Sequence, residues 1–197
     1  MDIITLASGF DHGQDHEEMK KEIRLGNING ILTFAAASNH GNAKYITFPA
    51  NMSGEVMTMF ASNGNVTANN TFNPAPSQYS RYNFALLGEQ VRVPPSDDLH
   101  DGTSISTFIG AAIAGLVLDF ANQNDILKKL SENKVRKALN EVSGMNAIFA
   151  EMARGGEHMR YDCVAPWKLR ASGRLERDQE RDDICRRIIG ALDVRNI

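Results

Sequence analysis

A serine near the start of an apolar segment is the residue of this 197-residue sequence best suited to covalent chemistry. Gly102-Thr103-Ser104 leads into the apolar run 108–118, which predicts a helix beginning near Ser104. Backbone N–H groups in the first turn of a helix have no partner within it, and the positive end of the helix dipole lies beside them. The Ser104 hydroxyl could therefore act as a nucleophile while its own N–H binds a developing oxyanion. The alternative is that Ser104 only caps the helix.

An asparagine supplies a second group of the same kind. Asn39 follows the apolar segment 31–37, which is typical of a buried strand, and open α/β sheets bind ligands at the carboxyl ends of their strands. The Asn39 amide could donate the second hydrogen bond to an oxyanion. Asparagine before a glycine-containing loop is by itself a common turn residue. The combination of Asn39 with the Ser104 segment is the more specific signal.

The segments that must position these two residues alternate between strand and helix patterns. We expect buried strands at 2–7, 31–37 and 56–61, and a further strand at 84–93 that ends at Pro94-Pro95. We expect helices at 15–25, at 104–121, within 125–139 and, with Ile184, Ile188 and Leu192 on one face, within 174–192. Strand, helix, strand predicts a right-handed crossover and hence an α/β protein with a parallel sheet.

Local signals set several boundaries between these elements. Asp15 and Glu18 can form a capping box that opens the first helix, and Gly26 and Gly30 should stop it. Asn63-Gly64 predicts a tight turn, and 69–80 is rich in Asn, Pro and Ser, which predicts a loop.

Composition is that of a soluble globular protein. Hydrophobic residues make up 42% and charged residues 23% of the chain, and 24 acidic against 21 basic residues give a net charge of −3. This balance provides no basic footprint for nucleic acid or an anionic membrane. The run 108–118 is also shorter than the roughly 20 residues that span a bilayer. With no secretory signal at the N-terminus, we expect a cytoplasmic location.

Charge divides the chain unevenly. Residues 151–197 hold 10 basic and 9 acidic side chains, a much higher density than the residues before them. We predict a core domain over 1–150 and a charged helical extension over 151–197. Cys163 and Cys185 are too few for a disulfide framework and are expected to be packing thiols.

Taken together, these segments resemble the subtilisin-like serine peptidases (subtilases). Residues 102–108 are similar to the motif Gly-Thr-Ser-x-Ala/Ser-Thr/Ser-Pro, which puts Ser104 on the nucleophile. Residues 35–39 are similar to Ala-Ala-Ala-Gly-Asn, which puts Asn39 on the oxyanion asparagine. The resemblance covers roughly residues 1–140. It implies a three-layer, parallel-sheet α/β fold and a serine endopeptidase that acts on polypeptides without a cofactor.

The resemblance also implies a substrate-binding region. Residues 2–9 resemble the segment that pairs with substrate backbone, and 48–50 resemble an aromatic-Pro-Ala element, often with a cis proline, near the specificity pocket. The implied substrate-binding residues are Ala7, Ser8, Gly9, Ala37, Ser38, Phe48 and Pro49. The sequence departs from the family at Ala7 and Ser8, at Ser38 in place of a glycine, and at Phe108 in place of a proline.

The largest departure concerns the other two catalytic residues. In subtilases the order is Asp, His, Ser, and the Asp and His segments belong before the strand 2–7. None of the five histidines aligns with the general base. We therefore expect the carboxyl-terminal part of a peptidase domain, inactive by itself, with the missing amino-terminal half as a partner. The alternative is a degenerate, non-catalytic module that binds extended peptides.

Two further readings are disfavoured. His12 and His16, with acidic residues around them, could bind a metal, but Gly13 weakens a helical ligand face and the capping box explains the acids. We predict no metal site. An α/β-hydrolase is excluded because residues 102–106 lack the second glycine of the nucleophile elbow.

Overall fold

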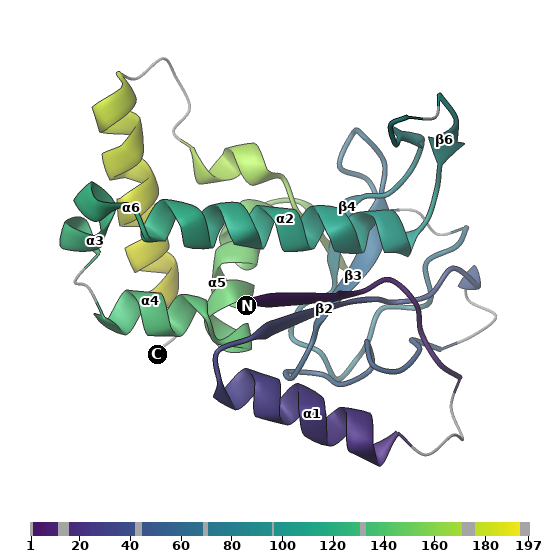
Figure 1. The fold of residues 1–197 in the computed structure, drawn as a ribbon. Coiled ribbons are helices and arrows are strands. Elements are labelled where there is room, and N and C mark those ends of the chain that lie inside the picture. The colour runs from purple at the N-terminus through teal and green to yellow at the C-terminus, as the bar shows by residue number, and fades with distance from the viewer. Residues whose placement is uncertain are drawn as a thin grey trace.

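The centre of the molecule is a six-stranded sheet with the order β1-β2-β3-β4-β8-β7, shown in the computed structural model of Figure 1. The strands are β1 (Ile3–Leu6), β2 (Leu32–Ala36), β3 (Met57–Ser62), β4 (Phe84–Leu87), β7 (Glu157–His158) and β8 (Tyr161–Cys163). Neighbours from β1 to β8 pair in parallel, and β7 pairs antiparallel with β8. The structure describes residues 2–11, 16–41, 45–68, 71–95, 97–130, 133–170 and 176–193.

Helices cover both faces of this sheet, which confirms the predicted α/β fold. On one face, α2 (Thr103–Ala121) lies across β1 to β4. Its core is shared with α3 (Asn124–Lys129), α4 (Asn133–Leu139), α5 (Val142–Ala153) and α6 (Arg177–Asp193). On the other face, α1 (Glu17–Ile28) packs Ile23 against Ala35 and Val56. By length and composition alone α2 could cross a membrane, as many core helices could, and here it lies on four strands.

The alternation of side chains along the central strands explains why both faces are covered. In β2, Leu32 and Phe34 point into the core with α2 and α5, whereas Ala35 belongs to the core beneath α1. All five residues of β2 are buried. A strand with two apolar faces is stable only between two layers, because each uncovered face would cost about 25 cal/mol per Å² of apolar surface left in water.

Several element boundaries differ from the predicted ones. The first helix continues through Gly26 to Ile28 and ends before Gly30, which has a φ of 74°. A glycine inside a helix costs about 1 kcal/mol, which packing can offset. His16 occupies the N-cap position, and Asp15 of the predicted capping box lies outside the described residues. The turn at Asn63 is confirmed, since its Oδ1 accepts hydrogen bonds from two backbone N–H groups beyond it.

The predicted strand 84–93 is two strands, a second correction. β4 ends at Leu87, and β5 (Val91–Arg92) pairs antiparallel with β6 (Leu99–His100) in a separate ribbon. Gly88 divides them where the chain touches α2. A Cβ at Gly88 would lie 2.2 Å from Ser106 Oγ, so this approach requires glycine. The helix predicted within 125–139 is likewise two helices, α3 and α4.

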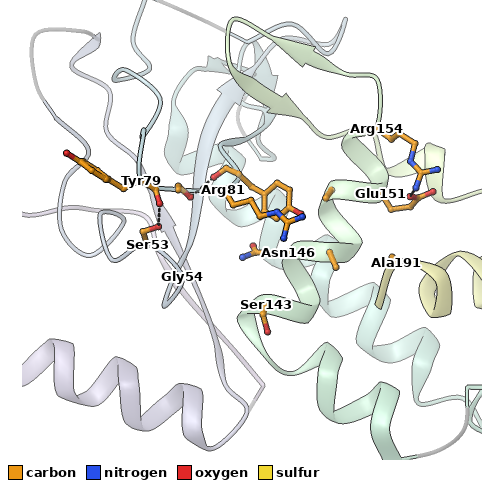
Figure 2. Close-up of a pocket in the computed structure, with 13 residues that line it drawn as sticks. Ser53, Gly54, Tyr79, Arg81, Ser143, Asn146, Glu151, Arg154 and Ala191 are labelled. Atoms are coloured by element: carbon orange, nitrogen blue, oxygen red, sulfur yellow. Dashed lines mark hydrogen bonds and ion pairs between the residues drawn. The ribbon is translucent and has the colours of Figure 1, made fainter. Parts of the chain in front are cut away.

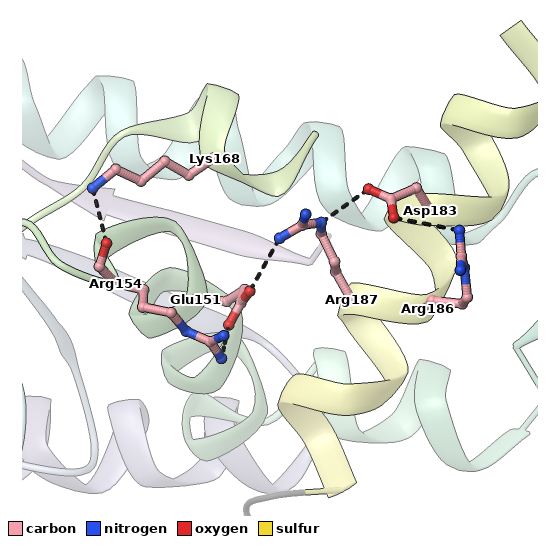
Figure 3. Close-up of polar contacts among 6 residues, drawn as sticks. All are labelled: Glu151, Arg154, Lys168, Asp183, Arg186 and Arg187. Atoms are coloured by element: carbon pink, nitrogen blue, oxygen red, sulfur yellow. Dashed lines mark hydrogen bonds and ion pairs between the residues drawn. The ribbon is translucent and has the colours of Figure 1, made fainter. Parts of the chain in front are cut away.

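Residues after 150 take part in the same sheet and core. They complete α5, add β7 and β8, and form the short 3₁₀ helix η2 (Pro166–Leu169) before α6. Ile188 and Leu192 of α6 are buried in the main core. Figure 3 shows the polar contacts of Arg187 in α6. Its Nε lies 2.9 Å from Asp183 Oδ2 of the same helix, and its Nη1 lies 3.5 Å from Glu151 Oε1 of α5. The expected boundary between residues 150 and 151 falls inside α5.

Candidate active site

Ser104 is the second residue of α2, and its side chain points back to the end of β1. Gly102 occupies the N-cap position, with no side-chain cap. The Ser104 hydroxyl instead donates a 2.7 Å hydrogen bond to the Ala7 carbonyl, directly after β1. The interpretation of Ser104 as a helix cap is therefore wrong. Its N–H, in the first turn, has no hydrogen-bond partner among the described residues.

Asn39 lies beside the same turn of α2. Its Oδ1 accepts hydrogen bonds from the Thr103 N–H (2.8 Å) and from Thr103 Oγ1 (3.0 Å). Because both donors belong to Thr103, the amide oxygen of Asn39 faces Thr103 and its nitrogen, Nδ2, points away from these donors. Within the described part of the chain, Nδ2 donates to no other group. The site therefore holds a hydroxyl and two N–H donors not used by the described residues, one from backbone and one from an amide.

Gly102 is required for this arrangement. A Cβ at Gly102 would lie 2.8 Å from Asn39 Nδ2, and its φ of 141° is a conformation that side chains rarely adopt. Asn39 can thus approach the helix terminus closely because the residue before Thr103 has no side chain.

Three segments predicted to bind substrate lie next to one another here. Phe10 and Phe48 exchange backbone hydrogen bonds of 2.8 and 3.1 Å, and the Thr47 N–H donates to the Ala37 carbonyl at 3.0 Å. Gly9 is pressed against Thr47, whose Oγ1 would lie 2.0 Å from a Cβ at Gly9. The implied residues Ala7, Ser8, Gly9, Ala37, Ser38, Phe48 and Pro49 all come from these segments, and the Phe48–Pro49 bond is cis. Their roles stay predictions.

Ser38 adopts an unusual backbone conformation beside Asn39. Its φ is 147°, and its side chain is buried with Oγ accepting a 3.2 Å hydrogen bond from the His40 N–H. Such a conformation costs about 1–3 kcal/mol for a residue other than glycine. The departure from glycine noted in the sequence therefore places strain directly next to the amide donor.

No described histidine is placed as a base for Ser104. His16, His40, His100 and His158 make no hydrogen bond to Ser104 Oγ. The His16 ring stacks on Phe48 with a centroid distance of 4.3 Å. The other three lie after β2, in β6 and in β7. His12 is outside the described residues.

Metal-binding and thiol chemistry find no support at this site. The described residues contain no cluster of three or more His, Cys, Asp or Glu side chains that could hold a metal ion. His12 and Asp15, part of the disfavoured metal reading, lie outside those residues. Cys163 and Cys185 are buried free thiols, and burial raises the pKa of both, which makes each a poor nucleophile.

Sequence reasoning missed one residue of the candidate site and the surface pockets. Thr103 holds the Asn39 amide by a hydrogen bond. The Gly-Thr-Ser motif could have drawn attention to Thr103, but its contact with Asn39 depends on the fold. The pocket of Figure 2, about 480 Å³, lies between the segment 79–82 and α5. No predicted site residue lines it.

Comparisons with known proteins bear on the fold. No known family and no curated protein matches this chain in sequence. Among solved structures, the prenylagaramide maturation protease PagA is similar with a TM-score of 0.62 at 20% identity, over 97% of this chain and 62% of PagA. A mutant of the PatA protease domain gives 0.60 at 19%, over 99% and 60%. The PatG macrocyclase domain gives 0.59 at 14%, over 83% and 48%.

The fold is subtilase-like. At these low sequence identities, the similarity shows that the chain has the same fold and does not show that it has the same activity. The chain spans about three-fifths of the length of PagA and of the PatA domain, with 62% and 60% covered.

Proposed function

We propose that this chain forms part of a subtilisin-type serine endopeptidase, with Ser104 as nucleophile and Asn39 as oxyanion donor. One observation carries the proposal. The Asn39 amide is held through its oxygen by Thr103 at 2.8 and 3.0 Å, beside the helix turn that presents the Ser104 hydroxyl and N–H. The structural similarity to proteases and to a macrocyclase supports the same reading, because their fold accommodates chemistry on peptides.

In the proposed reaction, Ser104 Oγ attacks the carbonyl carbon of a peptide bond. The negative charge that develops on the carbonyl oxygen is stabilised by the Asn39 amide and the Ser104 N–H. A histidine outside this chain takes the hydroxyl proton and later gives it to the leaving amine, and an aspartate orients that histidine. Water then attacks the acyl group and releases Ser104.

The chain by itself is proposed to be inactive, because among the described residues the hydroxyl proton of Ser104 has no base to receive it. Its hydrogen-bond acceptor is the Ala7 carbonyl, and a peptide carbonyl is far too weak a base for proton transfer. A serine hydroxyl without an adjacent base is a weak nucleophile near neutral pH. We therefore propose that the Asp and His come from outside this chain.

The same hydrogen bond supports an alternative function, a module that binds extended peptides without cutting them. Ser104 donating to Ala7 is a satisfied, resting arrangement. Ala7, Ser8 and Phe108 depart from the peptidase pattern, and the Phe108 ring is exposed beside the site. A binding module would use the backbone of residues 7–9 and would not need the hydroxyl.

Labelling with a fluorophosphonate separates the two functions. The protein is isolated from its own source with whatever accompanies it, and the modified residue is identified by mass spectrometry. An endopeptidase should be labelled at Ser104, and Ser104→Ala should abolish the label. Asn39→Ala should remain folded and lose about 10²–10³-fold in turnover, the usual effect of removing one oxyanion donor.

Ser53→Ala is the matched control, since Ser53 is an exposed serine on a different part of the surface. It should leave labelling and turnover unchanged. Labelling that persists in Ser104→Ala, or unchanged turnover in Asn39→Ala, would contradict the assigned roles. Absence of any label, together with specific binding of an extended peptide, would establish the binding module instead.

A further inference from the structure

The pocket of Figure 2 is built from four segments that lie far apart in the sequence. Its volume is about 480 Å³, and its lining comes from the loop 53–54, the segment 79–82, α5 and Ala191 of α6. The lining residues of α5 recur at three- and four-residue spacing from Ser143 to Arg154, so they share one face of the helix. A hollow of this volume is in the range of small-molecule sites.

This pocket lies at the opposite edge of the sheet from Ser104. The loop 53–54 precedes β3 and the segment 79–82 precedes β4, so both lie at the amino ends of parallel strands. Ser104 instead contacts Ala7, which follows the carboxyl end of β1. A ligand in this pocket would therefore occupy a site separate from the candidate active site.

An arginine without an acidic partner faces the pocket. In Figure 2 the Arg81 side chain extends from the segment 79–82 toward Asn146 of α5. Its guanidinium lies over the Tyr82 ring, 5.3 Å from the centroid, and that ring stacks on the buried Phe84 at 5.2 Å. Arg81 makes no ion pair or hydrogen bond with another described residue. The aromatic contact therefore positions the guanidinium and leaves its N–H groups available.

The α5 wall of the pocket also presents unused hydrogen-bond donors. The Asn146 amide makes no hydrogen bond with another described residue, and Arg154 uses only Nη2 in its ion pair with Glu151. Glu151 is the one acid among the described residues that line the pocket. Its carboxylate is already held by Arg154 at 2.5 Å and by Arg187 of α6 at 3.5 Å. The polar groups that remain free for a ligand are thus donors.

A chain of ion pairs beside the pocket carries a net positive charge. Figure 3 shows its members, which are Glu151, Arg154, Asp183, Arg186 and Arg187. Three arginines share two carboxylates there, so one positive charge stays uncompensated, and Arg81 adds another across the pocket. The whole chain has a net charge of −3, so this is a local excess of the opposite sign. Such an excess attracts anions.

The wall that carries Arg81 is held in place by hydrogen bonds of its own. Ser80 Oγ donates to the Tyr82 carbonyl at 2.7 Å, and Ser53 Oγ donates to the Tyr79 carbonyl at 3.4 Å, as Figure 2 shows for the second pair. These bonds place the segment 79–82 before any ligand arrives. A pre-formed wall lowers the entropy cost of binding.

The floor of the pocket is apolar. Ala147 and Ala150 of α5 and Ala191 of α6 line it, and all three are half-buried. Their short side chains leave room for an apolar group between the two helices and the segment 79–82.

We propose that this pocket binds a small organic anion, in which a carboxylate or phosphate is attached to a compact apolar body. Arg81 would hold two oxygens of the anionic group, Asn146 Nδ2 would donate to the same group, and the apolar body would lie on the alanines. A cation would find only a carboxylate that is already paired. An uncharged apolar ligand would cover the donors of Arg81 and Asn146 without satisfying them, which is unfavourable.

Isothermal titration calorimetry of the full protein with four probes tests this proposal. The probes are benzoate, phenyl phosphate, benzamide, which has the shape of benzoate without its charge, and inorganic phosphate, which has no apolar body. We expect benzoate or phenyl phosphate to bind with a dissociation constant of about 1 mM or lower, and at least about tenfold more tightly than benzamide and inorganic phosphate. The tighter of the two identifies the anionic group. Binding of neither, or equal binding of benzamide or inorganic phosphate, would overturn the proposal.

Substitution of the unpaired arginine gives a second measurement. Arg81→Gln should weaken binding of the tighter probe by about 10–100-fold, the usual effect of losing a hydrogen bond to a charged group. Arg136→Gln is the matched control, because Arg136 is an exposed arginine of α4 that does not line the pocket. Both side chains are exposed, so circular dichroism of both variants should stay unchanged. Equal binding by the Arg81 and Arg136 variants would contradict the assigned role of Arg81.

Photoaffinity labelling locates the site without any substitution. The azide of the tighter probe, 4-azidobenzoate or 4-azidophenyl phosphate, should label residues within 79–82 or 143–154 on irradiation, and an excess of the parent probe should prevent this. The neutral 4-azidobenzamide should leave these segments unlabelled. Labelling at other segments only, or labelling that the parent probe does not reduce, would overturn the proposed site.

Discussion

Around Asn39, close packing restricts which side chains the neighbouring positions can carry. Gly102 has no side chain because Asn39 occupies that space, and Gly9 has none because Thr47 does. Ser38 breaks this pattern, since it carries a side chain at a φ of 147°. Small changes at these positions should therefore have measurable effects on stability.

Ser38→Gly should be more stable than Ser38→Ala by roughly 1 kcal/mol. Both variants lose the hydrogen bond to the His40 N–H, so their difference isolates the backbone. Glycine stabilises the folded state by relieving about 1–3 kcal/mol of backbone strain. It also stabilises the unfolded state by about 0.4–1 kcal/mol, because its unfolded chain has more conformational entropy. Urea unfolding of the two variants measures this difference. Equal midpoints would mean that Ser38 is not strained.

Gly9→Ala should lower the free energy of unfolding by about 1–3 kcal/mol, the usual range for an overpacked position. The new Cβ would lie 2.0 Å from Thr47 Oγ1. Gly64→Ala is the control, because no atom lies within 4 Å of a Cβ there. The two urea midpoints decide the prediction, which fails if both variants unfold alike.

Among the elements, α6 is attached to α3 by two ion pairs, Lys129 with Asp182 and Arg181 with Asp125. Arg181 Nη2 lies 2.7 Å from Asp125 Oδ2 and donates to Gln123 Oε1 at 2.7 Å, and its guanidinium lies over the Phe120 ring at 5.3 Å. The hydrogen bond from Arg181 lowers the pKa of the Asp125 carboxyl. Three kinds of contact thus hold α6 against the end of α2 and α3.

Arg181→Gln should destabilise the protein at pH 7, and the difference from wild type should shrink on acidification. A carboxyl whose pKa is lowered by folding stabilises the native state above its unfolded pKa, roughly 3.9, and this stabilisation disappears as pH falls through the lower folded pKa. Urea unfolding at pH 7 and near pH 3 tests this sign. Arg186→Gln, with a side chain 75% exposed and 3.4 Å from Asp183, should change little at either pH.

For the molecule as a whole, local opening of the sheet should need less free energy at its edge strands than at its central strands. β2 and β3 are buried on both faces and paired on both sides, whereas β1 and β7 each have one unpaired side in the described sheet. Amide protons exchange fastest where local opening requires little exposure of apolar surface.

Hydrogen exchange of residues 1–197 expressed alone should therefore show fast exchange at β1 and slow exchange at β2 and β3. Mass spectrometry of peptic peptides that cover residues 3–6 and 32–36 gives the exchange rates of β1 and β2. Protection of β1 in the chain alone would contradict an open edge.

The sequence by itself determined the elements whose signals are local. Runs of apolar and β-branched residues predicted β1, β2 and β3 close to their observed bounds, because a strand buried on two faces admits little else. The motif at 102–104 and Asn39 predicted which residues would approach each other, although their catalytic roles are still proposals.

Only the tertiary structure decided the contacts between distant segments. Gly88 divides a predicted strand because α2 passes against it, and β7 and β8 join the sheet although their short segments carry no periodic signal. The sequence likewise did not predict that the Ser104 hydroxyl donates to the Ala7 carbonyl, 97 residues earlier. Hydrophobic periodicity records which face of an element is buried, whereas these contacts depend on which elements pack together, a property of the folded chain and not of any local pattern.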